Sequence, residues 1–208
     1  MPSDELPELP PTAFVKEDQG PDADFYAEPR LVTHIDAAAI AALTDVYRRL
    51  LPAGGVLLDL MSSWVSHLPD EVDYAEVIGH GMNAEELAAN PRLSRWFVQD
   101  LNADPALPLA DASLDGAMIC VGVQYLERPV AVLREAARAL KPGAPLVVSF
   151  SNRCFPTKAV AVWLALDAAG HGRLVELYLR RAGFDAVRIH PLIAGWTGDP
   201  LTAVVARR

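Results

Sequence analysis

The feature that most constrains the fold is an alternation of short apolar runs with helical stretches from about residue 34 onwards. Apolar residues at helical spacing predict helices over about 34–50, 129–140, 157–168 and 172–182. Short apolar runs predict strands near 55–60, 75–79, 97–100, 114–120, 145–150, 185–190 and 201–206. Strands that are buried on both faces and alternate with helices are typical of parallel sheets. The chain is therefore predicted to have an α/β fold.

The last two predicted strands are joined by only about ten residues. A parallel pair of strands needs a longer crossover connection, so these two strands are expected to form an antiparallel hairpin. The length of 208 residues leaves room for about one domain with a sizeable core.

The first 24 residues differ in composition from the rest of the chain. They contain five prolines and carry a net charge of −6, whereas residues 25–208 carry only −3 of the total of −9. Such a segment buries too little apolar surface to offset the entropy that is lost on ordering. We therefore expect residues 1–24 to be a flexible, acidic, proline-rich tail and residues 25–208 to form a single domain.

The composition also excludes several classes of protein. The nearly neutral domain lacks the clustered basic charge of a nucleic-acid-binding surface. No apolar run approaches the roughly 20 residues that span a bilayer, and the acidic amino terminus is unlike a signal peptide. Two cysteines and five scattered histidines show neither a disulfide framework nor metal-ligand spacing. These features predict a cytoplasmic protein with no nucleic-acid or membrane partner and no metal site.

Residues 98–150 contain three motifs at characteristic separations. They are Val98-Gln-Asp-Leu101, Leu107-Pro-Leu-Ala-Asp-Ala-Ser-Leu-Asp115 and Leu133-Arg-Glu-Ala-Ala-Arg-Ala-Leu-Lys-Pro-Gly143. They resemble the aspartate loop, the LPFxDxSFD segment and the LxExxRVLKPGG segment of the class I S-adenosylmethionine-dependent methyltransferases. The chain is most similar to the type 11 small-molecule group of that family, over roughly residues 30–206.

The resemblance implies a Rossmann-like, doubly wound, mostly parallel seven-stranded sheet with an antiparallel carboxy-terminal hairpin strand. It implies an enzyme that uses S-adenosylmethionine as cofactor and methylates a small-molecule acceptor by in-line transfer. Catalysis would then come mainly from holding the acceptor and the methyl group in line, with water excluded.

Two loops depart from the family pattern. The first-strand loop of the family reads D-x-G-x-G-x-G, but residues 59–67 contain no glycine. Here Ser62, Ser63 and Ser66 are expected to offer hydroxyl and N–H groups to the cofactor carboxylate, especially near a helix start. After the second strand, Gly81 stands where the family has an acid that holds the two ribose hydroxyls.

Two residues are candidates to replace that acid. Asn83 is favoured over Glu85 because it lies at the entry of a helix and faces the carboxyl edge of the sheet. The alternative is that the chain has lost the use of the cofactor.

The resemblance implies that the loops after the first four strands contact the cofactor. Asp100 would accept a hydrogen bond from the adenine amine beside the N–H of Leu101, and Met82 would pack on the adenine ring. Trp64 would lie either against the sulfonium, in a cation–π contact, or in the core. The expected cofactor residues are Asp59, Met61, Ser62, Ser63, Gly81, Met82, Asn83, Asp100, Leu101 and Val121.

His67 and Tyr26 are the candidates for removing a proton from the acceptor, because their segments border the methyl-transfer point. A structural histidine is the alternative for His67. Cys154 has no neighbouring base in the sequence and is not expected to be a nucleophile. The candidate acceptor contacts are Arg30, His34, Gln124, Tyr125, Asn152 and Arg153.

The two divergent loops leave a second function open. The chain would then be a non-methylating protein that binds S-adenosylmethionine or S-adenosylhomocysteine, or a regulatory subunit of the same fold. A third possibility is an enzyme that uses the sulfonium for other chemistry.

Overall fold

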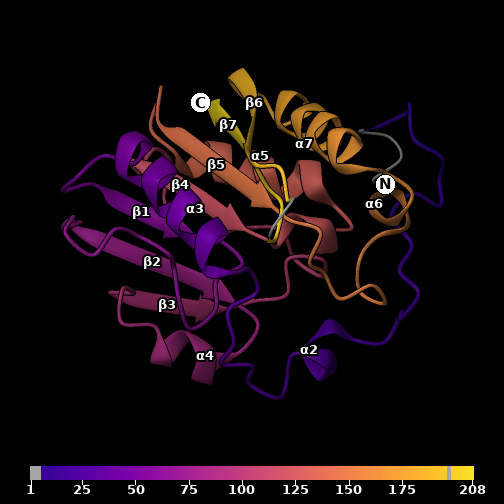
Figure 1. Cartoon of the computed structure of the whole chain (residues 1–208), viewed down its shortest axis with the longest axis horizontal. Helices are drawn as coiled ribbons and strands as arrows, with labels where there is room; N and C mark the ends of the chain where they lie inside the picture. Colours follow the sequence, from indigo (N-terminus) through magenta and orange to yellow (C-terminus); the bar gives the residue numbers. More distant parts are fainter. Residues whose placement is uncertain (1–5, 196–197) are drawn as a thin grey trace.

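The computed structural model describes residues 6–195 and 198–208, and a seven-stranded sheet forms its centre (Figure 1). The sheet order is β3-β2-β1-β4-β5-β7-β6. Strands β1 to β5 are parallel to one another, and β7 is antiparallel to both β5 and β6. The predicted fold class, including the antiparallel hairpin, is confirmed. The strands are β1 (Val56–Asp59), β2 (Glu76–Gly81), β3 (Arg95–Val98), β4 (Gly116–Cys120), β5 (Pro145–Phe150), β6 (Asp185–Ile193) and β7 (Leu201–Arg207).

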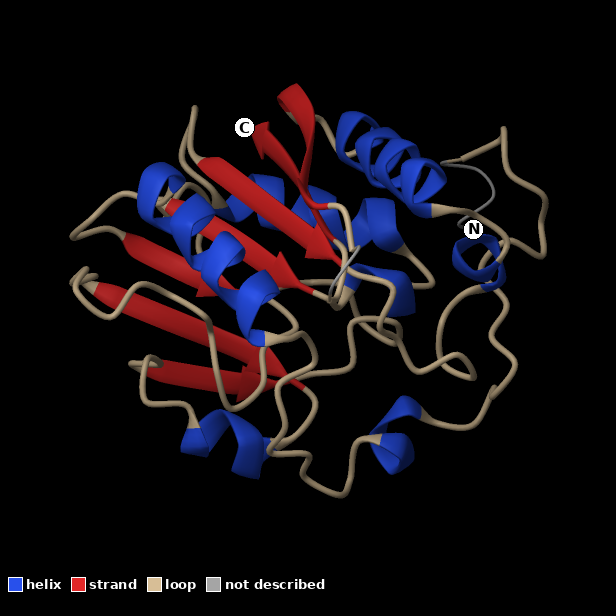
Figure 2. Ribbon diagram, in the orientation of Figure 1, coloured by secondary structure: helices blue, strands red, loops and turns tan. Residues whose placement is uncertain are grey.

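Helices cover both faces of this sheet (Figure 2). Helix α3 (Ala37–Leu50) lies on one face, and helices α5 (Pro129–Ala139) and α7 (Ala168–Arg181) lie on the other. Successive side chains of a strand point to opposite faces, so Leu57 joins the cluster under α3 while Leu58 joins the cluster under α5 and α7. Both residues are fully buried, which is why the central strands read as continuous apolar runs.

Two of these helices begin at residues that favour a helix start. Asp36 is the N-cap of α3, and its carboxylate accepts a hydrogen bond from the N–H of Ala39. Pro129 opens α5, where its fixed φ suits the first turn and its missing N–H costs nothing.

The remaining helices are short, and two crossovers contain none. These elements are α2 (Asp22–Phe25), α4 (Ala84–Ala89), α6 (Ala161–Leu164) and the 3₁₀ turn η1 (Val123–Tyr125). The helix expected over 157–168 is thus reduced to α6. Within the described chain, neither the β1–β2 connection nor the β3–β4 connection is helical. The helix start expected near Ser62 is therefore wrong, and backbone and side-chain tethers shape that loop instead.

Residues 6–24 pack against the domain. Leu6, Ala13 and Phe14 are buried, and the Phe14 ring lies 6.1 Å from the ring of Tyr178 on α7. The segment also runs beside residues 157–162, where the N–H of Val162 donates to the carbonyl of Ala13. The structure thus differs from the expected flexible tail, because a few apolar residues of this segment are buried on the α7 side of the core. Residues 1–5 lie outside the described residues.

In the described parts of the chain, no helix has the length and apolar character needed to cross a membrane.

Candidate functional site

A cavity of about 550 Å³ opens at the carboxyl edge of the sheet. It is lined by the segments that follow β1, β2, β3, β4 and β5 and by part of the amino-terminal segment. The chain leaves β1 toward β2 and leaves β4 toward β5, so the strand order reverses between β1 and β4. Open α/β sheets bind ligands at such a switch point, and this volume is within the usual range for ligand pockets.

The cavity brings together most of the residues that the sequence singled out. Arg30, Gln124 and Asn152 are not part of its lining. The predicted residues that do line it are Tyr26, His34, Asp59, Met61, Ser62, Ser63, His67, Gly81, Met82, Asn83, Asp100, Leu101, Val121, Tyr125 and Arg153.

His80 on β2 holds the glycine-free loop that follows β1. The N–H of Met61 donates to its Nδ1 at 3.1 Å, and the N–H of Ser62 donates to its carbonyl at 2.6 Å. Its Nε2 lies 2.9 Å from the carbonyl of Gln99, so the neutral Nε2–H tautomer satisfies both ring nitrogens. Burial lowers the pKa of His80 to about 4, which keeps that tautomer neutral at neutral pH. Sequence reasoning missed this role, because nothing in the sequence pairs His80 with a loop 19 residues away.

The turns after β1 and β4 both carry a non-glycine residue in the left-handed region. Met61 has φ +62° and Val121 has φ +45°. The β-branched side chain makes Val121 a genuine outlier. Residues held in this way cluster at ligand sites, because the surrounding structure must over-determine them.

Asp59 ends β1 as a buried carboxyl group with an exposed fraction of 2%. The Ser62 hydroxyl donates to its Oδ2 at 2.6 Å. Burial raises the pKa of Asp59 to about 7, and the hydroxyls of Ser62 and Ser66 oppose that rise only in part. No basic side chain in the described residues pairs with it. A positively charged ligand group in the cavity would favour its ionised form.

Gly81 is in close contact with the same loop. A Cβ at this position would lie 2.6 Å from the carbonyl oxygen of Ser62. The backbone after β1 thus occupies the space that an acidic side chain at position 81 would need.

Asn83 has all of its side-chain hydrogen-bonding capacity committed. Its Oδ1 caps α4 by accepting from the N–H groups of Glu85 and Glu86, and its Nδ2 donates to the carbonyls of Tyr26 and Ala27. The side chain therefore fixes the amino-terminal segment to α4. This geometry does not favour the ribose contact expected for Asn83.

Glu86 lines the cavity, although the sequence did not single it out. Its exposed fraction is 8%, whereas its neighbour Glu85 is exposed. Its Oε1 accepts from the N–H of Arg30 at 2.6 Å, and its Oε2 accepts from the Ser63 hydroxyl at 2.5 Å. In the sequence, only the helical period could have indicated that Glu86 is buried while Glu85 is exposed.

Asp100 follows β3 and is only partly committed. Its Oδ1 accepts from the N–H groups of Asn102 and Ala103 in an Asx turn. Within the described chain, no hydrogen bond of the other carboxylate oxygen was found. Leu101 beside it is buried.

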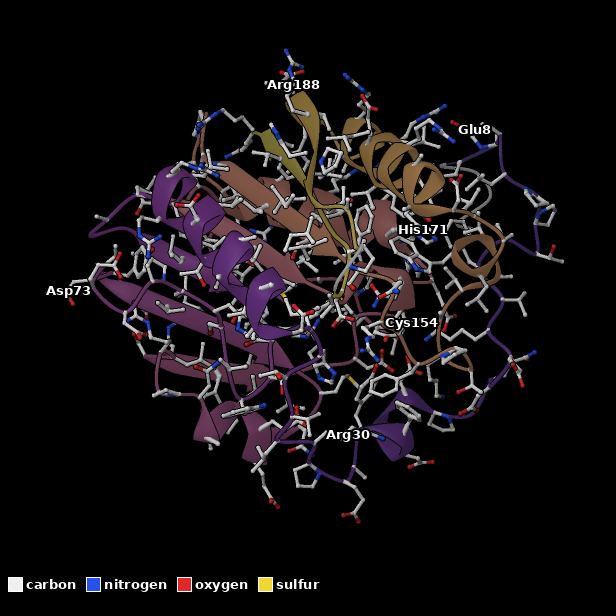
Figure 3. All side chains as sticks on the ribbon, viewed as in Figure 1. Glu8, Arg30, Asp73, Cys154, His171 and Arg188 are labelled. Atoms are coloured by element: carbon white, nitrogen blue, oxygen red, sulfur yellow. The ribbon has the colours of Figure 1, made fainter. Side chains whose placement is uncertain are left out.

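Arg30 does not face the cavity. Its guanidinium lies over the rings of Phe25, Tyr26 and Phe155, at 4.5, 5.7 and 5.3 Å from their centroids. It also donates to the carbonyl of Phe25. In Figure 3, Arg30 lies next to α2, beyond the ends of the strands. This geometry does not favour the acceptor contact expected for Arg30, because the guanidinium is enclosed by an aromatic cluster.

The two residues expected to remove a proton differ in suitability. Burial raises the pKa of Tyr26 far above its usual range, so its phenol stays protonated and suits a donor rather than a base. Burial and the nearby His34 lower the pKa of His67 to about 4, and burial lowers that of His34. Both imidazoles line the cavity as neutral groups at neutral pH.

The loop after β5 forms another wall. Arg153 Nε donates to Asp199 at 2.8 Å, and Asp199 and Asp36 exchange backbone-to-carboxylate hydrogen bonds. Cys154 lines the cavity next to Phe155, and burial raises the pKa of its thiol.

The other predicted residues lie outside this wall. Asn152 is exposed, and Gln124 is buried behind the cavity with its Nε2 donating to the Val121 carbonyl. The indole N–H of Trp64 donates to the Val32 carbonyl, and Trp64 is not part of the lining.

A buried ion cluster fixes the amino-terminal segment over the cavity. Asp22, which lines the cavity, pairs with Lys16 at 2.6 Å and with Lys158 at 3.2 Å. The side chains of both lysines are almost fully buried. Although burial opposes it, the lysines and Asn102 lower the pKa of Asp22. The weak signal in the sequence is that Lys16 is the single base among seven acids in residues 1–24.

No group of three or more His, Cys, Asp or Glu side chains in the described residues is arranged to hold a metal ion.

Comparison with known proteins relates the site to one family. Residues 63–148 match a family model described as a methyltransferase domain. Malonyl-[acyl-carrier protein] O-methyltransferase of Methylococcus capsulatus is 33% identical over 90 residues, which cover 40% of this chain and 33% of that protein. The chain thus spans about one third of the length of this curated relative.

Solved structures share the fold at lower identity. An S-adenosylmethionine-dependent methyltransferase from Aquifex aeolicus superposes with a TM-score of 0.60 at 17% identity, covering 99% of this chain and 97% of that one. A methyltransferase of the same kind from Mesorhizobium loti gives 0.57 at 20% identity, covering 81% and 98%. At these identities the similarity shows the fold alone.

Proposed function

We propose that this chain is a class I S-adenosylmethionine-dependent methyltransferase that transfers a methyl group to a small-molecule acceptor. The observation that carries the proposal is the cavity at the β1–β4 switch point. The family motifs supply Asp59, Asp100 and Leu101 to its lining, and the amino-terminal and β5 segments supply the rest.

The donor set fits the cofactor. Asp59, Glu86 and Asp100 line the cavity without a basic partner in the described chain, and the one arginine in the lining is paired with Asp199. This excess of carboxyl groups suits a sulfonium, whose positive charge would favour the ionised form of Asp59. Among the described residues, no hydrogen bond uses the second carboxylate oxygen of Asp100, which leaves it for an amine donor such as that of adenine. Asp100 and Leu101 would hold the adenine end, and Asp59, Ser62 and the loop fastened by His80 would hold the methionine end.

The bound cofactor would supply an already activated methyl group. The chain itself then has to orient the acceptor, exclude water and accept a proton where the acceptor carries one. The segment held by the Asp22 ion cluster forms part of the cavity wall, which suits a small acceptor. His67 and His34 line the cavity as neutral groups, and each can take a proton at the ring nitrogen that carries none.

The test is release of S-adenosylhomocysteine from S-adenosylmethionine in the presence of a panel of small amines, phenols, thiols and carboxylic acids. We expect acceptor-dependent release by the intact chain. A variant with His67 replaced, H67A, should lose turnover with high-pKa acceptors while it still binds the cofactor. Absence of any acceptor-dependent release across the panel would contradict the proposal.

One observation favours a second function. The loop after β1 contains no glycine, and in the described chain no helix lies between this loop and β2. Under this alternative the chain binds S-adenosylmethionine without transferring its methyl group, alone or as a regulatory subunit. Saturable binding with no release of S-adenosylhomocysteine by the protein in any acceptor mixture would support it.

A further inference from the structure

Gly81 leaves the proposed cofactor site without a carboxylate at the end of β2. The strand cannot supply one in the observed conformation, because a Cβ at position 81 would lie 2.6 Å from the Ser62 carbonyl oxygen. The Met61 and Ser62 N–H groups fix that loop to His80, so it cannot withdraw without breaking two hydrogen bonds. A carboxylate for the vicinal diol of a ribose must therefore come from another element.

The neighbouring candidates on α4 are unsuitable. Asn83 has four hydrogen bonds that use both ends of its amide. Glu85 is exposed and does not line the cavity.

Glu86 meets the requirements for this role. Its exposed fraction is only 8%, yet it lines the cavity together with Gly81 and Met82. Each carboxylate oxygen accepts one hydrogen bond, from the N–H of Arg30 or the hydroxyl of Ser63. A carboxylate has about four acceptor positions, so about two remain. No ion pair of Glu86 was found in the described residues, so its charge is not met by a protein cation.

Given the proposed function, we propose that Glu86 accepts hydrogen bonds from the ribose hydroxyls of the cofactor. The carboxylate that the family places at the end of the second strand is thus supplied by the following helix. The Ser63 and Arg30 contacts hold it in place and leave its remaining acceptor positions for the diol.

The experiment compares the binding of S-adenosylhomocysteine with that of its 2′-deoxyribose counterpart, by calorimetry on the full chain. The variants are E86Q and E86D, and E85Q is the matched control on the exposed face of α4. A hydrogen bond to a charged group contributes about 1.5–3 kcal/mol, so the wild type and E85Q should bind the deoxy compound at least about tenfold more weakly. In E86Q this difference should shrink to less than about threefold, and S-adenosylhomocysteine itself should bind about tenfold more weakly.

The comparison of two ligands separates a ribose contact from a structural tether. Loss of the Ser63 and Arg30 contacts alone would weaken both ligands equally and leave their ratio unchanged. The inference would be overturned if folded E86Q still bound the deoxy compound at least about tenfold more weakly than S-adenosylhomocysteine. If E86Q does not fold, the same result in E86D would overturn it. A wild type that binds both ligands equally would also overturn it, whereas a wild type that binds neither would contradict the proposed function itself.

Discussion

The two halves of the sheet are built in different ways around one cavity. In the β4–α5–β5 half, strands alternate with a regular helix, and the motif over residues 133–143 is present almost unchanged. In the β1–β2–β3 half, the β1–β2 connection has no helix in the described chain, and the loop has no glycine. There, the side chains of His80 and Asn83 accept hydrogen bonds from backbone N–H groups, and the Ser62 hydroxyl donates to the Asp59 carboxylate. The difference indicates that side chains can replace glycine-dependent backbone geometry in this fold.

The largest expected effect concerns Asp59 and pH. Its folded-state pKa of about 7 lies above the value of roughly 3.9 in an unfolded chain, so the native state binds more protons between these values. The contribution of this group to stability is complete below about pH 4 and is lost as the pH rises through 7. About three pKa units correspond to a loss of up to about 4 kcal/mol.

Urea unfolding from pH 4 to pH 8 measures this effect. In Asp59→Asn this component of the pH dependence should disappear, whereas the exposed control Asp24→Asn should behave as the wild type does. An unchanged pH profile in Asp59→Asn would show that the carboxyl group ionises normally in the folded chain.

The next largest effect is expected at His80. Replacing it by Ala leaves the buried N–H of Met61 without its acceptor and opens a void, so we expect a loss of about 2–3 kcal/mol in the free energy of unfolding. Binding of S-adenosylhomocysteine should weaken as well, because the loop is released. The exposed His190 on β6 is the matched control, and His190→Ala should change neither quantity. If His80→Ala were as stable as the wild type, the loop after β1 would keep its conformation without His80.

A smaller effect is expected in the regular half. Arg138 on α5 donates to the carbonyls of Leu107 and Leu109 and pairs with Glu135. Arg138→Met keeps the apolar stem and should lower stability by about 1–2 kcal/mol, with cofactor affinity unchanged. Arg180→Met, which breaks an exposed pair with Glu176, should cost less than about 0.5 kcal/mol. If Arg138→Met instead weakened binding as much as His80→Ala does, the proposed difference between the two halves would be wrong.

The sequence predicted the elements whose formation depends on local pattern. The central strands were visible as apolar runs because both of their faces are buried, and α5 was visible from Pro129 and its apolar period. The same logic placed Asp59 and Asp100 at strand ends, and therefore at one edge of the sheet.

Features that depend on distant partners were not predictable in this way. Residues 6–24 look like a polar tail, and only packing against α7 and residues 157–162 reveals their role. The sequence shows Glu85 and Glu86 as equivalent acids, and their burial differs because α4 turns one of them inward. The amide nitrogen of Asn83 has no donor left for a ligand, because it donates to the carbonyls of residues 26 and 27, more than 50 residues earlier in the chain.

The central claim is that the β1–β2–β3 half, in which side chains hold the loop after β1, still completes a cofactor site. Calorimetric titration of the intact chain with S-adenosylhomocysteine tests it most directly, with Asp100→Ala measured in parallel. We predict saturable binding at one site, weakened about tenfold in Asp100→Ala by the loss of the proposed hydrogen bond to the adenine amine. No binding by the wild type up to millimolar concentration would leave this chain with the fold of the family and without its cofactor.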